Sequence, residues 1–121
     1  MDRMERFVQQ FKANLELKMN ECRELIEEYS ARGGCALWGA ATKGAMLLNH
    51  LDPEAKFVRY VIDLNPAKHG KFIPGTGHAI VPPSHLTVSP VAGILLMNPN
   101  YLDENMRLLR QLGVTTPLEC V

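Results

Sequence analysis

The sequence predicts an α/β fold: a single Rossmann-like, doubly wound and mostly parallel sheet of about five strands, preceded by a long N-terminal helix. Two observations lead to this prediction. After residue 33, short apolar runs alternate with helix-like segments, as in β-α-β units. Before it, residues 1–32 contain neither Gly nor Pro and repeat apolar residues every three or four positions. We therefore assign 1–32 to a helix and 33–121 to one Rossmann-like domain.

The first segment is expected to form one helix that ends at Gly33-Gly34, because glycine is favoured just beyond a helix C-terminus. Its apolar stripe resembles a heptad seam that Lys18 interrupts. Three roles stay open: packing on its own domain, linking to a further domain, or pairing with a second copy. The stripe comprises Met4, Val8, Phe11, Leu15, Cys22, Leu25 and Tyr29.

Strand-like and helix-like segments alternate after the two glycines. The run at 92–97 is apolar on both faces, which places it centrally in a parallel sheet. Asp52-Pro53 ends the first helix of the domain, and Ser84 is suited to cap a short helical turn. The expected strands cover 35–38, 57–62, 79–81, 92–97 and 114–120, and the expected helices cover 45–51 and 101–112.

Composition and charge exclude several classes of partner. Thirteen Lys and Arg residues balance thirteen Asp and Glu residues, so neither nucleic acid nor an anionic membrane is expected to bind. No apolar run approaches the roughly 20 residues of a membrane span, and the charged N-terminus is unlike a secretory signal. Three cysteines without a CxxC pair favour a reduced, cytoplasmic setting.

Metal and catalytic patterns are weak. His69, His78 and His85 are separated by nine and seven residues, which matches no common ligand spacing, so no metal is expected. A histidine or Asp63 could act as a general base, but the sequence selects none of them. Catalytic residues are therefore left unassigned.

A glycine-rich turn lies where a dinucleotide-binding turn belongs, directly after the strand at 35–38. Gly39-x-Ala41-x-x-Gly44 has the required spacing, with alanine at the second glycine. The small residues permit a tight turn and a close phosphate, and free N–H groups at the helix start face an anion. Lys43 adds a cation there, although the helix dipole disfavours one. The alternative is a tight turn without a ligand, with Lys43 in solvent.

The next strand ends in a carboxylate and a cationic loop. Asp63 lies 19 residues beyond Gly44, where a carboxylate can accept hydrogen bonds from ribose hydroxyls. The loop 64–78 carries two lysines and two histidines at the carboxyl end of a strand, which is the ligand-bearing edge of such a sheet. A diphosphate would suit this edge. A solvated loop stiffened by prolines is the alternative.

Four short motifs occur together in this chain: WGAATKG at 38–44, VIDLNPAKHGK at 61–71, PGT at 74–76, and NPNY at 98–101 followed by DE at 103–104. Over essentially residues 5–120 the chain resembles the C-terminal domain of S-adenosylmethionine-dependent sugar C-methyltransferases. It departs from that pattern at Leu64, where a basic residue is common, and at Gly77-His78, which replace a more apolar pair.

The resemblance implies a Rossmann-like domain that helps to hold a nucleotide-linked sugar. Longer members carry a zinc-binding N-terminal domain and a central domain that binds S-adenosylmethionine. No cofactor is therefore expected in this chain, S-adenosylmethionine is expected in a partner or another domain, and the chain is not expected to be catalytic alone. Carried over residue by residue, the ligand-binding positions are Gly39, Ala40, Ala41, Thr42, Lys43, Gly44, Asp63, Asn65, Lys68, His69, Lys71, Gly75, Thr76, Asn98 and Tyr101.

Three functions stay open from the sequence. The leading one is a module that binds a nucleotide-linked sugar or a related phosphate ligand, as an accessory or excised part of a methyltransferase system. The second is a minimal enzyme that uses the glycine-rich turn for S-adenosylmethionine or NAD. The third is an interaction protein in which residues 1–32 form a homodimer or dock on a methyltransferase partner, with a vestigial pocket.

Overall fold

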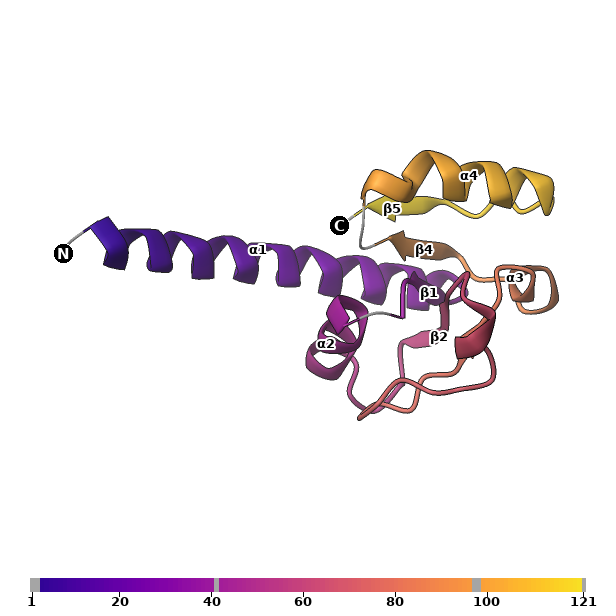
Figure 1. Ribbon diagram of the computed structural model, residues 1–121, viewed down its shortest axis with the longest axis horizontal. Helices are drawn as coiled ribbons and strands as arrows, with labels where there is room; N and C mark the ends of the chain where they lie inside the picture. The colour runs from indigo at the N-terminus through magenta and orange to yellow at the C-terminus, as the bar shows by residue number, and fades with distance from the viewer. Residues whose placement is uncertain (1–2, 41, 97–98, 121) are drawn as a thin grey trace.

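The computed structural model, shown in Figure 1, describes residues 3–40, 42–96 and 99–120. Within those ranges the strands are β1 (Cys35–Trp38), β2 (Val58–Ile62), β3 (Ile80–Val81), β4 (Gly93–Leu96) and β5 (Leu118–Cys120). The helices are α1 (Arg3–Arg32), α2 (Thr42–Leu51), α3 (His85–Val88) and α4 (Leu102–Gln111), with the 3-10 helices η1 (Pro66–Lys68) and η2 (Pro99–Tyr101).

The strands form one sheet in the order β3-β2-β1-β4-β5, and each neighbouring pair is parallel. The predicted α/β class, the five-stranded doubly wound sheet and the N-terminal helix are confirmed. From β1 the chain builds outward to β2 and β3, then returns to place β4 on the other side of β1. The loops that follow β1 and β4 therefore diverge, which makes the carboxyl ends of these two strands the topological switch point of the sheet.

The sheet is buried on both faces. On one face α1 and α2 contribute Cys22, Ile26, Leu47 and Leu48 to a core with residues of β1 and β2. On the other face α3 and α4 contribute Leu86 and Leu109 to a second core with the alternate residues of the strands. Every residue of β1 and β4 is buried, as expected for the central strands of a parallel sheet.

The helix α1 is longer than the body of the protein requires. Its C-terminal part packs on the sheet through Cys22, Ile26 and Tyr29, and a Cβ on Gly93 would lie 2.4 Å from ring atoms of Tyr29. Its N-terminal part projects past the sheet on the side where the C-terminus lies (Figure 1). Packing on the domain thus accounts for only part of the helix. Neither α1 nor any other described helix is both long and apolar enough to span a membrane.

Four local predictions need correction. The helix after the glycine-rich turn begins at Thr42, three residues before the expected Ala45, because its first turn carries polar residues that an apolar pattern does not detect. Ser84 precedes α3 but makes no side-chain capping hydrogen bond, since its backbone is already helical (φ −60°, ψ −20°). Two expected strands are shorter than predicted: the one over 79–81 is limited to β3, Ile80–Val81, and the one over 114–120 to β5, Leu118–Cys120.

A buried polar cluster joins α2 to the start of β2. The carboxylate of Asp52, 1% exposed, accepts backbone hydrogen bonds from Lys56, Phe57 and Val58 at 2.8, 3.1 and 2.9 Å. His78, also 1% exposed, places Nε2 2.9 Å from Asp52 Oδ2 and Nδ1 2.6 Å from Thr76 Oγ1. Because an ionised carboxylate only accepts, His78 Nε2–H is the donor to Asp52. This cluster fixes the segment 73–78 at the amino-terminal edge of the sheet, where β2 begins.

Alkaline conditions are expected to destabilise the fold through Cys35. This thiol is fully buried in β1, and burial, with a smaller contribution from the charge of Asp52, raises its pKa from 9.0 to about 12. Between pH 9 and 12 the unfolded chain loses this proton before the folded chain does, so the free energy of unfolding falls as pH rises. At pH 10.5 the loss is about 2 kcal/mol. Urea unfolding at pH 7.5 and 10.5 measures it, and Cys35→Ala should show a smaller pH dependence than the natural chain.

Candidate functional site

The glycine-rich turn after β1 has the backbone that its spacing predicts. Gly39 has φ +121°, in the left-handed region that favours glycine, and no atom of the described residues lies within 4 Å of the place where its Cβ would stand. A Cβ on Gly44 would lie 2.2 Å from the carbonyl oxygen of Gly39. The first glycine therefore makes the turn and leaves open space beside it, and the last one allows α2 to start against the turn.

Asp63 connects this turn to the loop that follows β2. Its Oδ2 accepts the N–H of Ala40 at 3.1 Å, and its Oδ1 accepts the N–H of Asn65 at 2.9 Å. The ammonium of Lys68 lies 3.8 Å from Oδ2, and His69 Nε2 lies 2.6 Å from the Asp63 carbonyl oxygen. Five residues singled out from the sequence are thus brought together at the carboxyl end of β2.

The contact between Asp63 and Ala40 limits which N–H groups near the turn could meet an anion. The sequence predicts that N–H groups at the helix start face an anion, and the N–H of Ala40, which precedes α2, is bound by the Asp63 carboxylate. A carboxylate has about four acceptor positions, and the backbone N–H groups of Ala40 and Asn65 use two of them. Asp63 therefore keeps acceptor capacity for hydroxyl groups beside the turn, and an anion would have to bind farther along, at the start of α2.

Cationic side chains surround this edge. Lys43 is exposed at the start of α2 and makes no ion pair within the described part of the chain. Lys68, on η1, is partly buried against Asp63, and Lys71 is exposed in the segment beside β3. Asn65 holds η1 in place, because its Oδ1 accepts the Ala67 N–H at 3.1 Å. The arrangement offers cations and hydroxyl acceptors within one loop region.

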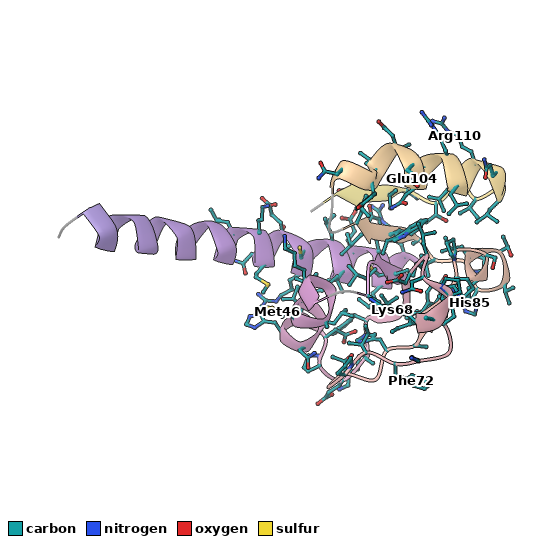
Figure 2. All side chains as sticks on the ribbon, in the orientation of Figure 1. Met46, Lys68, Phe72, His85, Glu104 and Arg110 are labelled. Atoms are coloured by element: carbon teal, nitrogen blue, oxygen red, sulfur yellow. The ribbon has the colours of Figure 1, made fainter. Side chains whose placement is uncertain are left out.

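Other predicted positions lie elsewhere. Gly75 and Thr76 form the tip of an antiparallel arm in which Phe72 pairs with Ala79, and Pro74 accepts a hydrogen bond from the Asn49 side chain at 3.0 Å. Because His78 binds Asp52 beside the start of β2, this tip lies at the edge opposite Asp63. Figure 2 shows Phe72, on this arm, on the other side of the molecule from Glu104 and Arg110 of α4.

The remaining predicted positions are less defined. Tyr101 is exposed at the end of η2, directly beyond β4. The predicted positions Ala41 and Asn98 lie outside the described residues, and the side chain of Thr42 is likewise not described. Across the described ranges, no three His, Cys, Asp or Glu side chains gather in a way that could hold a metal ion.

Two features of the site region are not apparent from the sequence. Asp52 and His78 are both fully buried and are paired with each other. The sequence pattern indicates only a helix end at Asp52 and a position in a basic loop at His78. A cleft of about 350 Å³ lies between Leu64 and one face of α4. Neither the buried pair nor the cleft can be recognised from residue spacing, because each is formed by residues that are far apart in the chain and that the fold brings together.

Comparison with known proteins agrees with this architecture. No curated protein matches the chain significantly. A solved structure of RSP, a Rex-family repressor, is similar over 73% of this chain and 52% of that one, with 14% sequence identity and a TM-score of 0.52. This chain thus spans about half the length of that repressor, and at such low identity the likeness concerns the fold alone. The model of the C-methyltransferase C-terminal domain family matches residues 1–115, and the chain belongs to that family.

Proposed function

We propose that this domain is the nucleotide-binding module of a sugar C-methyltransferase system and that it holds a nucleotide-linked sugar at the carboxyl edge of its sheet. The observation that carries the proposal is the placement of Asp63: its carboxylate lies against the glycine-rich turn at 3.1 Å from the Ala40 N–H and keeps acceptor positions for ribose hydroxyls. In parallel α/β sheets, ligands bind outside the carboxyl ends of the strands at the switch point.

The charges around Asp63 support a diphosphate as the neighbouring group. Lys43 stands at the start of α2, where the helix dipole and open N–H groups favour an anion and disfavour a cation. A bound diphosphate would attract the Lys43 ammonium and so offset the repulsion between this ammonium and the helix dipole. Asp63 itself would repel a phosphate, so we place its carboxylate at the ribose and the diphosphate at the beginning of α2.

Methyl transfer itself is assigned to another part of the system. S-adenosylmethionine would then be held by another domain or a partner chain, while this domain positions the acceptor sugar. Cys22 and Cys35 are buried free thiols, which is consistent with a reducing, cytoplasmic compartment. The minimal enzyme that uses the turn for S-adenosylmethionine or NAD stays as the alternative, and heat released on mixing with either cofactor would favour it.

Reversal of the charge at Lys43 is expected to weaken ligand binding without unfolding the protein. Millimolar UDP-glucose or dTDP-glucose should raise the melting temperature of the natural chain by several degrees if the Kd is near 10 μM. Lys43→Glu should bind at least about tenfold more weakly, because a carboxylate replaces an ammonium beside the phosphates. Its own unfolding free energy should change by less than about 0.5 kcal/mol, since the side chain is exposed.

Lys56→Glu is the matched control for this experiment. Lys56 is an exposed lysine at the opposite edge of the sheet, and its ammonium forms an ion pair with Glu54 at 2.7 Å. The Lys56→Glu variant has the same change in charge as Lys43→Glu, and the ligand should still raise its melting temperature. Equal loss of protection in both variants would show that only net charge matters, which contradicts a site at Lys43.

A second candidate function rests on α1. The helix is 30 residues long, or about 45 Å, and its N-terminal part projects beyond the sheet (Figure 1). The sequence continues the apolar stripe into that part at Met4, Val8, Phe11 and Leu15. An apolar stripe on a helix that projects in this way favours pairing with a second copy or docking on the methyltransferase.

The second candidate is tested by the mass in solution. If the helix makes a homodimer, light scattering should give about twice the chain mass of 13.5 kDa, and the double variant Val8→Glu, Phe11→Glu should be a monomer. The control Gln9→Glu, Gln10→Glu introduces the same charges off the stripe and should remain a dimer. A monomeric natural chain would exclude the homodimer.

A further inference from the structure

The cleft between the loop after β2 and α4 is suited to bind a flat, partly polar group. Its volume is about 350 Å³, and it is lined by Leu64, Glu104, Asn105, Arg107, Leu108 and Gln111. Small-molecule sites typically begin at about this size and combine apolar walls with a few polar groups. Here Leu64 and Leu108 supply the apolar walls, and Asn105 supplies a carboxamide.

Asn105 is a buried polar residue of this cleft, and no hydrogen bond to a described residue accounts for its burial. The residue is 2% exposed, and its carboxamide makes no hydrogen bond to any described residue. No side-chain nitrogen or oxygen in the described ranges is both fully buried and unpaired, so the carboxamide must reach the cleft that the residue lines. The carboxamide is therefore free to hydrogen-bond a ligand in the cleft without giving up a contact to a described residue.

The position of Leu64 relates the cleft to the proposed nucleotide site. Leu64 follows Asp63 directly and is 48% exposed, although a side chain of its size is normally buried. If the Asp63 carboxylate binds the ribose, the base attached to that ribose extends over the next residue. The apolar surface of Leu64 then has a function, which is to contact one face of the base.

The charges of the cleft decide which part of a nucleotide fits there. Glu104 and Arg107 both line the cleft, and α4 also carries Asp103 in its first turn. Because these charges include no excess of cations, a phosphate is not favoured there, whereas a neutral base fits between the apolar walls. A carboxamide offers a donor beside an acceptor, which matches the paired donor and acceptor on the edge of a nucleobase.

We propose that the cleft formed by Leu64, Asn105 and Leu108 is the seat of the nucleobase, and that the Asn105 carboxamide hydrogen-bonds the edge of the base. This inference rests on the proposed function, because it extends the same ligand from its ribose into the cleft. It assigns base selection to α4 and diphosphate binding to α2. Recognition of the two ends of the ligand would thus come from opposite faces of the sheet.

The test compares ligands with and without a base on the full chain. Calorimetric titrations with UDP, CDP, ADP and GDP are set against inorganic pyrophosphate. At least one nucleoside diphosphate should bind about tenfold or more tightly than pyrophosphate. Asn105→Leu should lower that affinity about tenfold and reduce the differences among the four bases, since a bidentate amide contact is lost. Its affinity for pyrophosphate should not change.

Controls separate this inference from the proposed function. Asn20→Leu makes the same chemical change on the exposed side of α1 and should bind all ligands as the natural chain does. Lys43→Glu should weaken nucleotides and pyrophosphate alike. If Asn105→Leu does not fold, Leu64→Ser, at an exposed position, should still lower the affinity for nucleoside diphosphates and not for pyrophosphate.

Two results would overturn the inference. If folded Asn105→Leu binds every nucleoside diphosphate as tightly as the natural chain, the base lies elsewhere, and the diphosphate site is unaffected. If pyrophosphate binds as tightly as the nucleotides, the cleft holds no base. Absence of binding for all five probes would instead remove the proposed function itself, and the base seat with it.

Discussion

Asp52→Ala is expected to cost about 4 kcal/mol or more of unfolding free energy, which is a large part of the 5–15 kcal/mol that stabilises a typical domain. The substitution removes the acceptor of three backbone N–H groups, those of Lys56, Phe57 and Val58, and also leaves Nε2 of the buried His78 ring without its partner. Each buried donor left unpaired costs about 1–3 kcal/mol. Urea unfolding followed by circular dichroism measures the loss.

Three further variants should lose less unfolding free energy than Asp52→Ala and serve as comparisons. Asp52→Asn keeps one acceptor oxygen and should lose less stability than alanine. Thr76→Val removes the contact of Thr76 Oγ1 with His78 Nδ1, at 2.6 Å, and a longer one with the His78 N–H, at 3.4 Å, and should cost about 1 kcal/mol. Asp103→Ala, at an exposed acid in the first turn of α4, should stay within about 0.5 kcal/mol. A loss of less than 1 kcal/mol for Asp52→Ala would contradict the role of this cluster in holding the edge of the sheet.

Gly44→Ala is expected to disrupt both the fold around the turn and ligand binding. The added Cβ would lie 2.2 Å from the carbonyl oxygen of Gly39, and a backbone atom cannot move aside as a flexible side chain does. Overpacking of this kind costs about 1–3 kcal/mol or more. The shift of α2 needed to relieve it would move Lys43 and the amides at the helix start, so protection by UDP-glucose should be lost as well. Thermal melts with and without the ligand measure both effects.

Gly113→Ala is the matched control for this substitution. Gly113 has φ +74°, and nothing lies within 4 Å of the place where its Cβ would stand. Its replacement should cost only about 1 kcal/mol of backbone strain and should leave ligand protection unchanged. If Gly44→Ala were no more destabilising than Gly113→Ala, the close contact between α2 and the turn would not be required.

The sheet could be predicted from the sequence because its central strands have a strong local signal. The runs at 35–38 and 92–97 are apolar on both faces, and the structure places β1 and β4 within them at the centre of the sheet. Boundaries were less accurate where polar residues begin an element, as at Thr42. The path of 70–78 could not be predicted, because it depends on the pairing of Asp52 with His78, 26 residues away.

The sequence predicts those parts of the candidate site whose residue spacing is set by the backbone geometry of a turn or a strand end. Gly39, Gly44 and Asp63 were identified because the turn and the end of β2 have fixed places in this fold. The contact of Asp63 with the Ala40 N–H was not, since it depends on how two loops approach each other. Asn105 has no signal at all: in the sequence it is an ordinary polar residue of a helix, and only the packing around α4 shows that it is buried.

The most direct test of the proposed site is an amide NMR titration of the full chain with UDP-glucose and dTDP-glucose. If the ligand binds at the carboxyl edge, the signals of Gly39, Gly44, Asp63 and Leu64 should shift with one common Kd, while those of Gly75 and Gly77, at the opposite edge, should stay in place. A folded chain whose spectrum does not change at millimolar ligand, or changes only around Gly75 and Gly77, would contradict a nucleotide-sugar site at the turn between β1 and α2.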